Sequence, residues 1–195
     1  MVAMNASSST VDDILACARS LIADAGYNGF SYADIADVVG IRKASIHHHF
    51  PSKVDLVRTL VERYREDARA GFDALERTAS DPRQQLLNYV AYWERCLAEA
   101  STPFCICALL ASELPALPPE VAAEIRLHFE ALSKWLSQAF ARGEIQGIFR
   151  LRSTPDNEAE AFMAAVHGGM LSARVHENPK LFTAVAASAL AHLAP

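Results

Sequence analysis

Long apolar runs are missing from this sequence of 195 residues. A transmembrane helix needs about 18–20 consecutive apolar residues, and no stretch approaches that length. The first residues, MVAMNASSSTVDD, do not combine a basic stretch with an apolar one, so they do not resemble a secretory signal. We expect a short polar tail over residues 1–10, a cytoplasmic location and no membrane partner.

Cysteine is also scarce. The chain has four cysteines, Cys17, Cys96, Cys105 and Cys107, which are too few for a disulfide scaffold at this length. Without an export signal, a reducing compartment and free thiols are expected. Neither a histidine nor a third cysteine completes a site close to Cys105 and Cys107, so we expect no bound metal and no other cofactor.

The sequence also lacks an overall excess of basic residues, because its formal net charge is −5. The charges are unevenly distributed, however. Residues 42–65 carry six basic side chains against two acidic ones, so the remainder of the chain is clearly acidic. A local basic stretch on an acidic body is typical of a protein that meets a polyanion with one end only.

Apolar residues at helical spacing run through almost the whole chain, and no strand pattern or internal repeat interrupts them. Ser31 and Ser52 each precede a helix and are followed three positions on by Asp34 and Asp55, as in a capping box. The pattern predicts an all-α fold with about nine helices. The expected helical segments are residues 11–25, 31–39, 43–49, 53–77, 82–100, a short piece within 104–114, 119–142, 156–175 and 179–193.

Two of these segments are short and are joined by a tight turn at Gly40, which is the arrangement of a helix-turn-helix. The second helix of such a unit enters the DNA major groove with its N-terminal residues leading. Here those residues supply two cations, a small side chain and a hydroxyl: Arg42, Lys43, Ala44 and Ser45. Many α-helical proteins contain short helix pairs, so the spacing alone leaves DNA binding open.

The segment FSYADIADVVGIRKASIHHHFPSKVDLV resembles the DNA-binding domain of TetR-family transcriptional regulators. The resemblance covers about residues 11–57 and includes Ile35-Ala36, the turn at Gly40-Ile41, Lys43, His48, Phe50 and Ser52-Lys53. It implies a three-helix DNA-binding domain over residues 1–52 and a helical sensing and dimerisation domain over 53–195, linked by helix 53–77. It also implies DNA contacts from Ser31, Tyr32, Arg42, Lys43, Ala44, Ser45, His47, His48 and Lys53.

Three consecutive histidines, His47, His48 and His49, lie inside this segment. Successive helical residues turn by about 100°, so three adjacent side chains point in three directions and cannot close on one metal ion. The resemblance implies that His47 replaces a tyrosine facing DNA and that His48 matches a histidine at the DNA backbone. It further implies that His49 replaces a tyrosine that helps hold the small domain together.

A helix-turn-helix reads few base pairs, so such proteins usually dimerise on a two-fold site. TetR-like proteins dimerise through their last two long helices, and both of those helices carry apolar stripes here. The alternative is that the stripes pack within one subunit. The candidate interface residues are Phe162, Val166, Gly169, Met170, Phe182, Val185, Ala186, Ala189 and Leu190.

The resemblance further implies a pocket among the middle helices, in which a small molecule shifts helix 53–77 and releases the DNA. Aromatic and sulfur-containing residues at helical spacing are the candidates for its lining, although plain core packing is the alternative for each. The candidate lining residues are Tyr89, Tyr92, Trp93, Cys96, Phe104, Cys105, Trp135, Phe162, Met163 and His167.

Cys105 lies in the stretch FCICALLASEL, with Glu113 eight residues later. This pattern resembles a TetR subgroup that includes the N-ethylmaleimide reductase repressor, which senses electrophiles and oxidants through the aligned cysteine. A cysteine near a helix start often has a lowered pKa and a larger thiolate fraction. The sequence departs from the subgroup because Phe104 replaces a glycine, so a small buried thiol is the alternative.

Together these patterns predict a homodimeric repressor that leaves a palindromic operator when a small-molecule effector binds its C-terminal domain. A redox- or electrophile-sensing repressor that switches through Cys105 is the alternative on the same fold. Two remote alternatives lack DNA binding: a helical adaptor, and a small enzyme using Cys105 with His128 or His167. We expect no enzymatic activity, because no nucleophile–base motif supports one.

Overall fold

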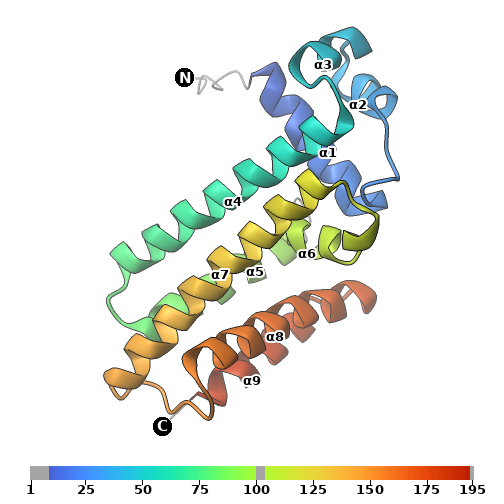
Figure 1. Ribbon diagram of the computed structural model, residues 1–195. Helices are drawn as coiled ribbons and strands as arrows, with labels where there is room; N and C mark the ends of the chain where they lie inside the picture. Colours follow the sequence, from blue (N-terminus) through green and yellow to red (C-terminus); the bar gives the residue numbers. More distant parts are fainter. Residues whose placement is uncertain (1–8, 100–103, 194–195) are drawn as a thin grey trace, which may run out of the picture.

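The computed structural model describes residues 9–99 and 104–193, and within these ranges the chain forms nine α-helices and no strand (Figure 1). The all-α prediction is confirmed. Most of the predicted polar tail and the last residue of the predicted helix 82–100 lie outside the described residues. The helices are α1 Thr10–Ala25, α2 Tyr32–Val39, α3 Lys43–His49, α4 Lys53–Thr78, α5 Pro82–Ala98, α6 Ile106–Ala111, α7 Pro119–Ile145, α8 Pro155–Val175 and α9 Lys180–Ala191, with a 3-10 turn η1 at Leu114–Ala116.

The same device begins three of the four N-terminal helices. A serine outside the helix accepts a hydrogen bond from the first turn, and an aspartate three positions on accepts one from the serine backbone. This reciprocal arrangement pairs backbone N–H groups that have no partner inside the helix. The serine–aspartate pairs are Ser9–Asp12, Ser31–Asp34 and Ser52–Asp55.

The first three helices and the start of α4 enclose a small apolar core around Ile14, Ile35 and Ile46, none of which reaches solvent. The hydroxyl of Tyr32 donates a hydrogen bond to the carbonyl of Phe50 at 2.9 Å and thereby fixes the end of α3. Burial raises the pKa of the Tyr32 phenol to about 12, so it stays a donor at neutral pH.

The long helix α4 leads from this small core into a body in which α7 packs along both α4 and α8, and α8 packs along α9 (Figure 1). Helices α5 and α6 pack against α7. A half-buried ion pair between Arg65 and Glu124, with a nitrogen–oxygen distance of 3.1 Å, ties α4 to α7. No helix in the described ranges has both the length and the apolar content that a membrane crossing requires.

The C-terminal end of α1 is held by the body. Both carboxylate oxygens of Glu113 lie 3.2 Å from the backbone nitrogen of Tyr27, which donates to them. Arg174, at the end of α8, donates to the carbonyl of Ala23 at 2.9 Å. Gly26, at φ +74°, brings the backbone against Glu113, and a Cβ there would lie 2.4 Å from its Oε1.

Most of the predicted dimer residues are buried within one subunit. Gly169 permits the close packing of α8 on α9, since a Cβ there would lie 3.3 Å from Phe182 and from Val185. Helix packing inside the subunit already covers the buried side chains of these stripes, and their contact with a second subunit stays a prediction. The buried ones are Phe162, Val166, Gly169, Met170, Phe182 and Ala186, whereas Val185, Ala189 and Leu190 are half-buried.

Two glycines in helices provide a test of this packing. Gly143→Ala should lower the free energy of unfolding by about 1–3 kcal/mol, because a Cβ there would lie 2.1 Å from the ring of Phe149. Gly71→Ala should raise it by about 1 kcal/mol, since nothing lies within 4 Å of its Cβ position. Urea unfolding of both variants measures the sign of each change in the free energy of unfolding. A stabilised Gly143→Ala variant would contradict the predicted clash with the Phe149 ring.

Candidate nucleic-acid interface and ligand cavity

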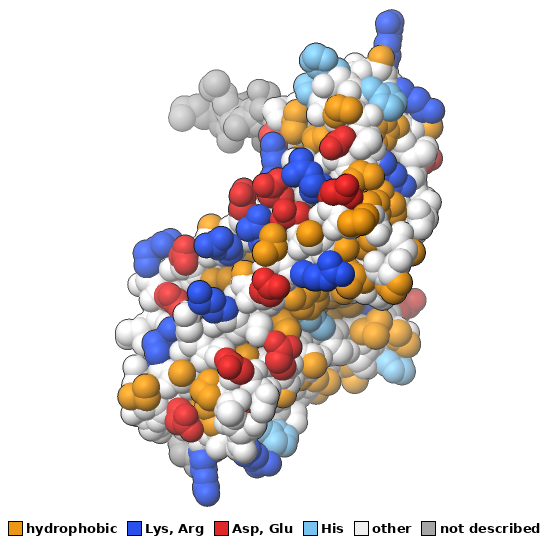
Figure 2. Space-filling view, in the orientation of Figure 1, with side chains coloured by type: hydrophobic (Ala, Val, Ile, Leu, Met, Phe, Trp, Pro, Cys, Tyr) orange, Lys and Arg blue, Asp and Glu red, His pale blue; other side chains and the backbone are white. Residues whose placement is uncertain are grey.

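The first turn of α3 is fully open to solvent. Arg42, Lys43, Ala44 and Ser45 are all exposed, and only Ile46 of this short helix is buried. None of the ion pairs in the described part of the chain uses Arg42 or Lys43. Figure 2 shows basic and histidine side chains gathered at the end of the molecule that α3 forms. This end therefore presents exposed cations that form no ion pair in the described residues, which suits a phosphate backbone.

The three histidines are exposed, and His47 lies apart from the other two. The ring of His47 lies against Tyr32 at a centroid distance of 4.8 Å, and its Nδ1 is 3.3 Å from the carbonyl oxygen of Pro51. The rings of His48 and His49 meet edge to face at 5.3 Å. His49 is exposed, so the implied role of holding the small domain together is wrong in this chain. Among the described residues no cluster of histidine, cysteine or carboxylate groups could hold a metal ion.

Three residues in the predicted DNA-contacting set are engaged within the protein. Ser31 caps α2, and Tyr32 is buried with its hydroxyl on Phe50. The Lys53 ammonium donates to the carbonyl of Phe30 and lies over the Phe30 ring, 3.9 Å from its centroid. Burial lowers the pKa of Lys53. Tyr32 and Lys53 thus hold the small domain together, while DNA contact by the exposed members stays a prediction.

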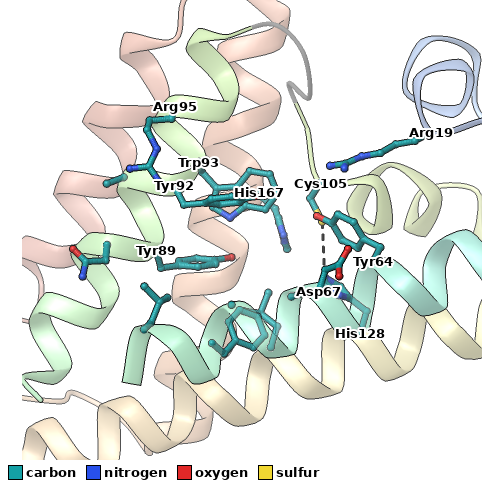
Figure 3. Close-up of a pocket in the computed structure, with 17 residues that line it drawn as sticks. Arg19, Tyr64, Asp67, Tyr89, Tyr92, Trp93, Arg95, Cys105, His128 and His167 are labelled. Atoms are coloured by element: carbon teal, nitrogen blue, oxygen red, sulfur yellow. Dashed lines mark hydrogen bonds between the residues drawn. The ribbon is translucent and has the colours of Figure 1, made fainter. Parts of the chain in front are cut away.

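A cavity of about 450 Å³ opens where α1, α4, α5, α7 and α8 meet (Figure 3). Five of the predicted lining residues reach it: Tyr89, Tyr92, Trp93, Cys105 and His167. The other residues that line the cavity were not predicted from the sequence. They are Arg19, Tyr64, Asp67, Ala68, Gly71, Phe72, Leu75, Asn88, Ala91, Arg95, His128 and Leu132.

The remaining predicted lining residues do not border this cavity. Trp135 lies one layer behind it, stacked on Phe72 at 4.8 Å and 10°. Phe162 packs edge-on against Phe140, and Met163 faces a separate surface hollow. Cys96 and Phe104 also fall outside the lining set. Sequence periodicity identifies the apolar side of each helix, but the rotation of neighbouring helices decides which part of that side faces the cavity.

Cys105 is the chemically distinctive residue of the cavity. Its sulfur lies 3.9 Å from Nε2 of His128 and is almost fully buried (Figure 3). Hydrogen bonding from the Cys107 thiol, and then from the imidazoles of His128 and His167, holds the pKa of the Cys105 thiol well below its usual value. Burial raises the pKa of the Cys107 thiol instead. The arrangement favours a thiolate at Cys105 that can attack an electrophile.

Several polar atoms around the cavity are buried without a hydrogen-bond partner in the described structure. They are Nε1 of Trp93, Nδ1 of His128 and Nε2 of His167. Buried polar groups are nearly always paired in folded proteins, so each such atom needs an explanation. Sequence reasoning found Trp93 and His167 from their helix phase, but it missed His128 as a lining residue and Arg19 altogether, because α1 was assigned entirely to the small domain.

Comparison with known proteins adds independent information. Residues 14–60 match a profile described as bacterial regulatory proteins of the tetR family. A solved TetR-family transcriptional regulator from Agrobacterium tumefaciens is 55% identical to the chain, with a TM-score of 0.93 over 95% of this chain and 97% of that one. Reduced NemR from E. coli has a TM-score of 0.80 at 20% identity, over 95% of this chain and 98% of that one, which shows a shared fold.

The curated relatives match over shorter lengths. The transcriptional activator FasR of Mycolicibacterium smegmatis is 27% identical over 118 residues, which is 60% of this chain and 52% of that protein. The chain therefore spans about half the length of this relative.

Proposed function

Since this chain belongs to the TetR family of bacterial DNA-binding transcriptional regulators, we propose that it is a cytoplasmic repressor that a small molecule releases from its operator. The observation that supports this is the exposed first turn of α3, whose Arg42 and Lys43 are uncompensated on a chain of net charge −5. Arg42, Lys43, Ser45, His47 and His48 are the proposed contacts with the operator, and none of their side chains is needed for the small apolar core.

The position of the cavity supports release by a ligand. Its walls include α4, which runs directly into the helix-turn-helix, and α1, which packs on α2. A ligand that fits the cavity better when these helices stand in a DNA-incompetent arrangement will shift the population toward that arrangement. Its free energy of coupling to DNA is the difference between its affinities for the two states.

We propose that the regulator is a homodimer that uses the outer faces of α8 and α9. One exposed stripe of α8 recurs at steps of three and four and consists of small or apolar residues: Ala161, Ala164, Gly168, Leu171 and Val175. The exposed alanines of α9 are Ala184, Ala187 and Ala191. Such a stripe lets two helices approach closely. A two-fold pair of subunits would present two α3 helices to a palindromic site.

A second candidate function is a redox- or electrophile-responsive repressor that switches through Cys105. The specific observation in its favour is that Cys105 lines the cavity beside His128, with its thiol pKa lowered. An electrophile that enters the cavity would meet a thiolate there, and the adduct would occupy the same space as a reversible ligand.

The DNA assignment is tested at α3. Lys43→Ala and His48→Ala should each weaken binding to a duplex selected by the wild-type protein, by about tenfold for a lost phosphate or base contact. Lys43→Ala should also reduce the steepness of the salt dependence, because one fewer counterion is released. Gel-shift titrations at fixed salt measure this. Lys134→Ala, exposed on α7, is the matched control; equal loss in all three variants would contradict the assignment.

The dimer face is tested by charge insertion. Ala164→Arg should convert the dimer into monomers at micromolar concentration, because a long cation cannot fit between closely packed small residues. Light scattering coupled to size-exclusion chromatography measures the mass. Ala70→Arg makes the same change at an exposed position of α4 and should leave the dimer intact. A dimeric Ala164→Arg variant would place the interface elsewhere.

The cysteine switch is tested by combining thiol mass spectrometry with DNA binding. N-ethylmaleimide should modify Cys105 ahead of Cys107, because only the Cys105 thiol has a lowered pKa. Treated wild-type protein should lose its operator affinity, and Cys105→Ser should keep it after the same treatment. Cys96→Ser is the control variant. If treated Cys105→Ser loses operator affinity as readily as wild type does, Cys105 is a structural residue. Release by a reversibly bound small molecule then stands as the proposed function.

A further inference from the structure

We propose that the effector is an aromatic carboxylate whose anionic group binds Arg19 of α1, so that the DNA-reading unit itself contributes to the ligand site. This inference rests on the proposed function and specifies the chemistry of its ligand. Four features of the cavity carry it: the origin of Arg19, the absence of Arg19 from the ion pairs of the described residues, the aromatic wall and the unpaired buried polar atoms.

Arg19 is the lining residue contributed by α1. The buried side of α1, with Ile14, Ala18 and Ile22, faces the small core, whereas Arg19 leaves that core and reaches toward Tyr64 and Cys105 (Figure 3). Its guanidinium carbon lies 5.3 Å from the centroid of the Tyr64 ring. The side chain is half-buried, and none of the ion pairs in the described ranges includes it.

The lining contains a half-buried guanidinium that belongs to no ion pair in the described residues. Arg19 and Arg95 bring two permanent positive charges, against the Asp67 carboxylate and the Cys105 thiol, whose pKa is lowered; Arg95 and Asp67 are both exposed, whereas Arg19 is half-buried. A purely apolar ligand would desolvate the Arg19 guanidinium without giving it an ion-pair partner. A carboxylate matches the planar fork of a guanidinium with two parallel hydrogen bonds.

The wall beyond the guanidinium is aromatic. Tyr64, Phe72, Tyr89, Tyr92 and Trp93 all line the cavity, and the rings of Tyr92 and Trp93 meet edge to face at 5.1 Å. Flat rings stack against such surfaces in offset or edge-on arrangements. A volume of about 450 Å³ lies within the range of cavities that bind drug-sized molecules, so one to three fused or linked rings fit.

The unpaired buried atoms are matched by oxygen atoms on the ligand. The indole N–H of Trp93 can only donate a hydrogen bond, and this side chain is 5% exposed. His128, 3% exposed, has Nδ1 unpaired at the same cavity, and this nitrogen is an acceptor when Nε2 of the neutral ring donates to Cys105. A carboxylate or a phenolic oxygen accepts from the indole N–H, and a phenolic hydroxyl can donate to Nδ1, whereas a hydrocarbon leaves both atoms unsatisfied. Binding an oxygenated aromatic acid therefore satisfies polar groups that the protein alone leaves unpaired.

The site of Arg19 gives the ligand a direct route to DNA binding. A carboxylate held by Arg19, with its rings against residues of α4 and α5, links α1 to the body across the cavity. The ligand then favours whichever position of α1 brings Arg19 nearest to the aromatic wall. Arg19 is thus a specificity-determining residue that also transmits binding to the helix-turn-helix.

Calorimetric titration of the full-length dimer tests the proposal. The probes are benzoate, cinnamate, naphthoate and hydroxynaphthoate, each paired with its neutral primary amide. At least one acid should bind wild type at least tenfold more tightly than its amide. Arg19→Gln should remove that preference, whereas Arg83→Gln, an exposed arginine of α5 outside the cavity, should keep it. Arg19→Lys, which retains the charge, should keep part of the preference.

Several outcomes would overturn the proposal: no acid binds wild type, each acid binds no better than its amide, or Arg19→Gln retains the preference. Operator affinity without a probe is measured in parallel, so that misfolding of Arg19→Gln is detected. If that variant fails to fold, the acid–amide comparison in wild type and the Arg19→Lys titration decide. Failure of wild type to bind any duplex would instead contradict the repressor function, independently of the calorimetry.

Discussion

The attachment of α1 to the body is the constraint on which the rest of this molecule depends. The small apolar core around Ile35 and Ile46 belongs to the same continuous apolar core as the body. In addition, Glu113 holds the backbone of Tyr27, and Arg174 holds the carbonyl of Ala23. Both α1 and α4 border the cavity, α1 packs on α2 and α4 follows α3 in the chain, so these two helices join the cavity to the helix-turn-helix.

The cavity and the DNA-reading end differ in how their polar groups are exposed. At α3 the cations are exposed and belong to no ion pair in the described residues. Water solvates them, so this costs little free energy, and they stay available for contact with phosphates. In the cavity the polar atoms of Trp93 and His128 are buried and unpaired, which is unfavourable until a ligand arrives. The same protein thus keeps one site that is always available and another whose unsatisfied groups favour occupation. Cys105 belongs to the second site, and its contact with His128 gives that site a reactive group besides a recognising one.

Much of the fold could be predicted from local signals, and the reasons are physical. Capping boxes at Ser31 and Ser52, the left-handed Gly40 and the apolar periodicity act within a few residues, so the helix boundaries followed closely. The exposed first turn of α3 was predictable for the same reason.

The orientation of side chains between helices could not be predicted in this way. Phe162 and Met170 belong to an apolar stripe that could face a partner or a neighbouring helix, and only the packing of α7, α8 and α9 decides that they lie inside. Arg19 was missed because its cavity is assembled from helices far apart in the sequence.

The glycine at the end of α1 has a consequence for how such a sequence can diverge. At φ +74° and ψ −175° Gly26 adopts a conformation that is essentially restricted to glycine. Asparagine and aspartate tolerate other left-handed turns, but here a side chain would also collide with the Glu113 carboxylate. Two independent restrictions therefore fall on one position, one from the backbone conformation and one from the carboxylate of Glu113. A substitution at Gly26 therefore faces two costs: removal of the Glu113 side chain would relieve only the second, and it would also remove the carboxylate that holds the backbone of Tyr27.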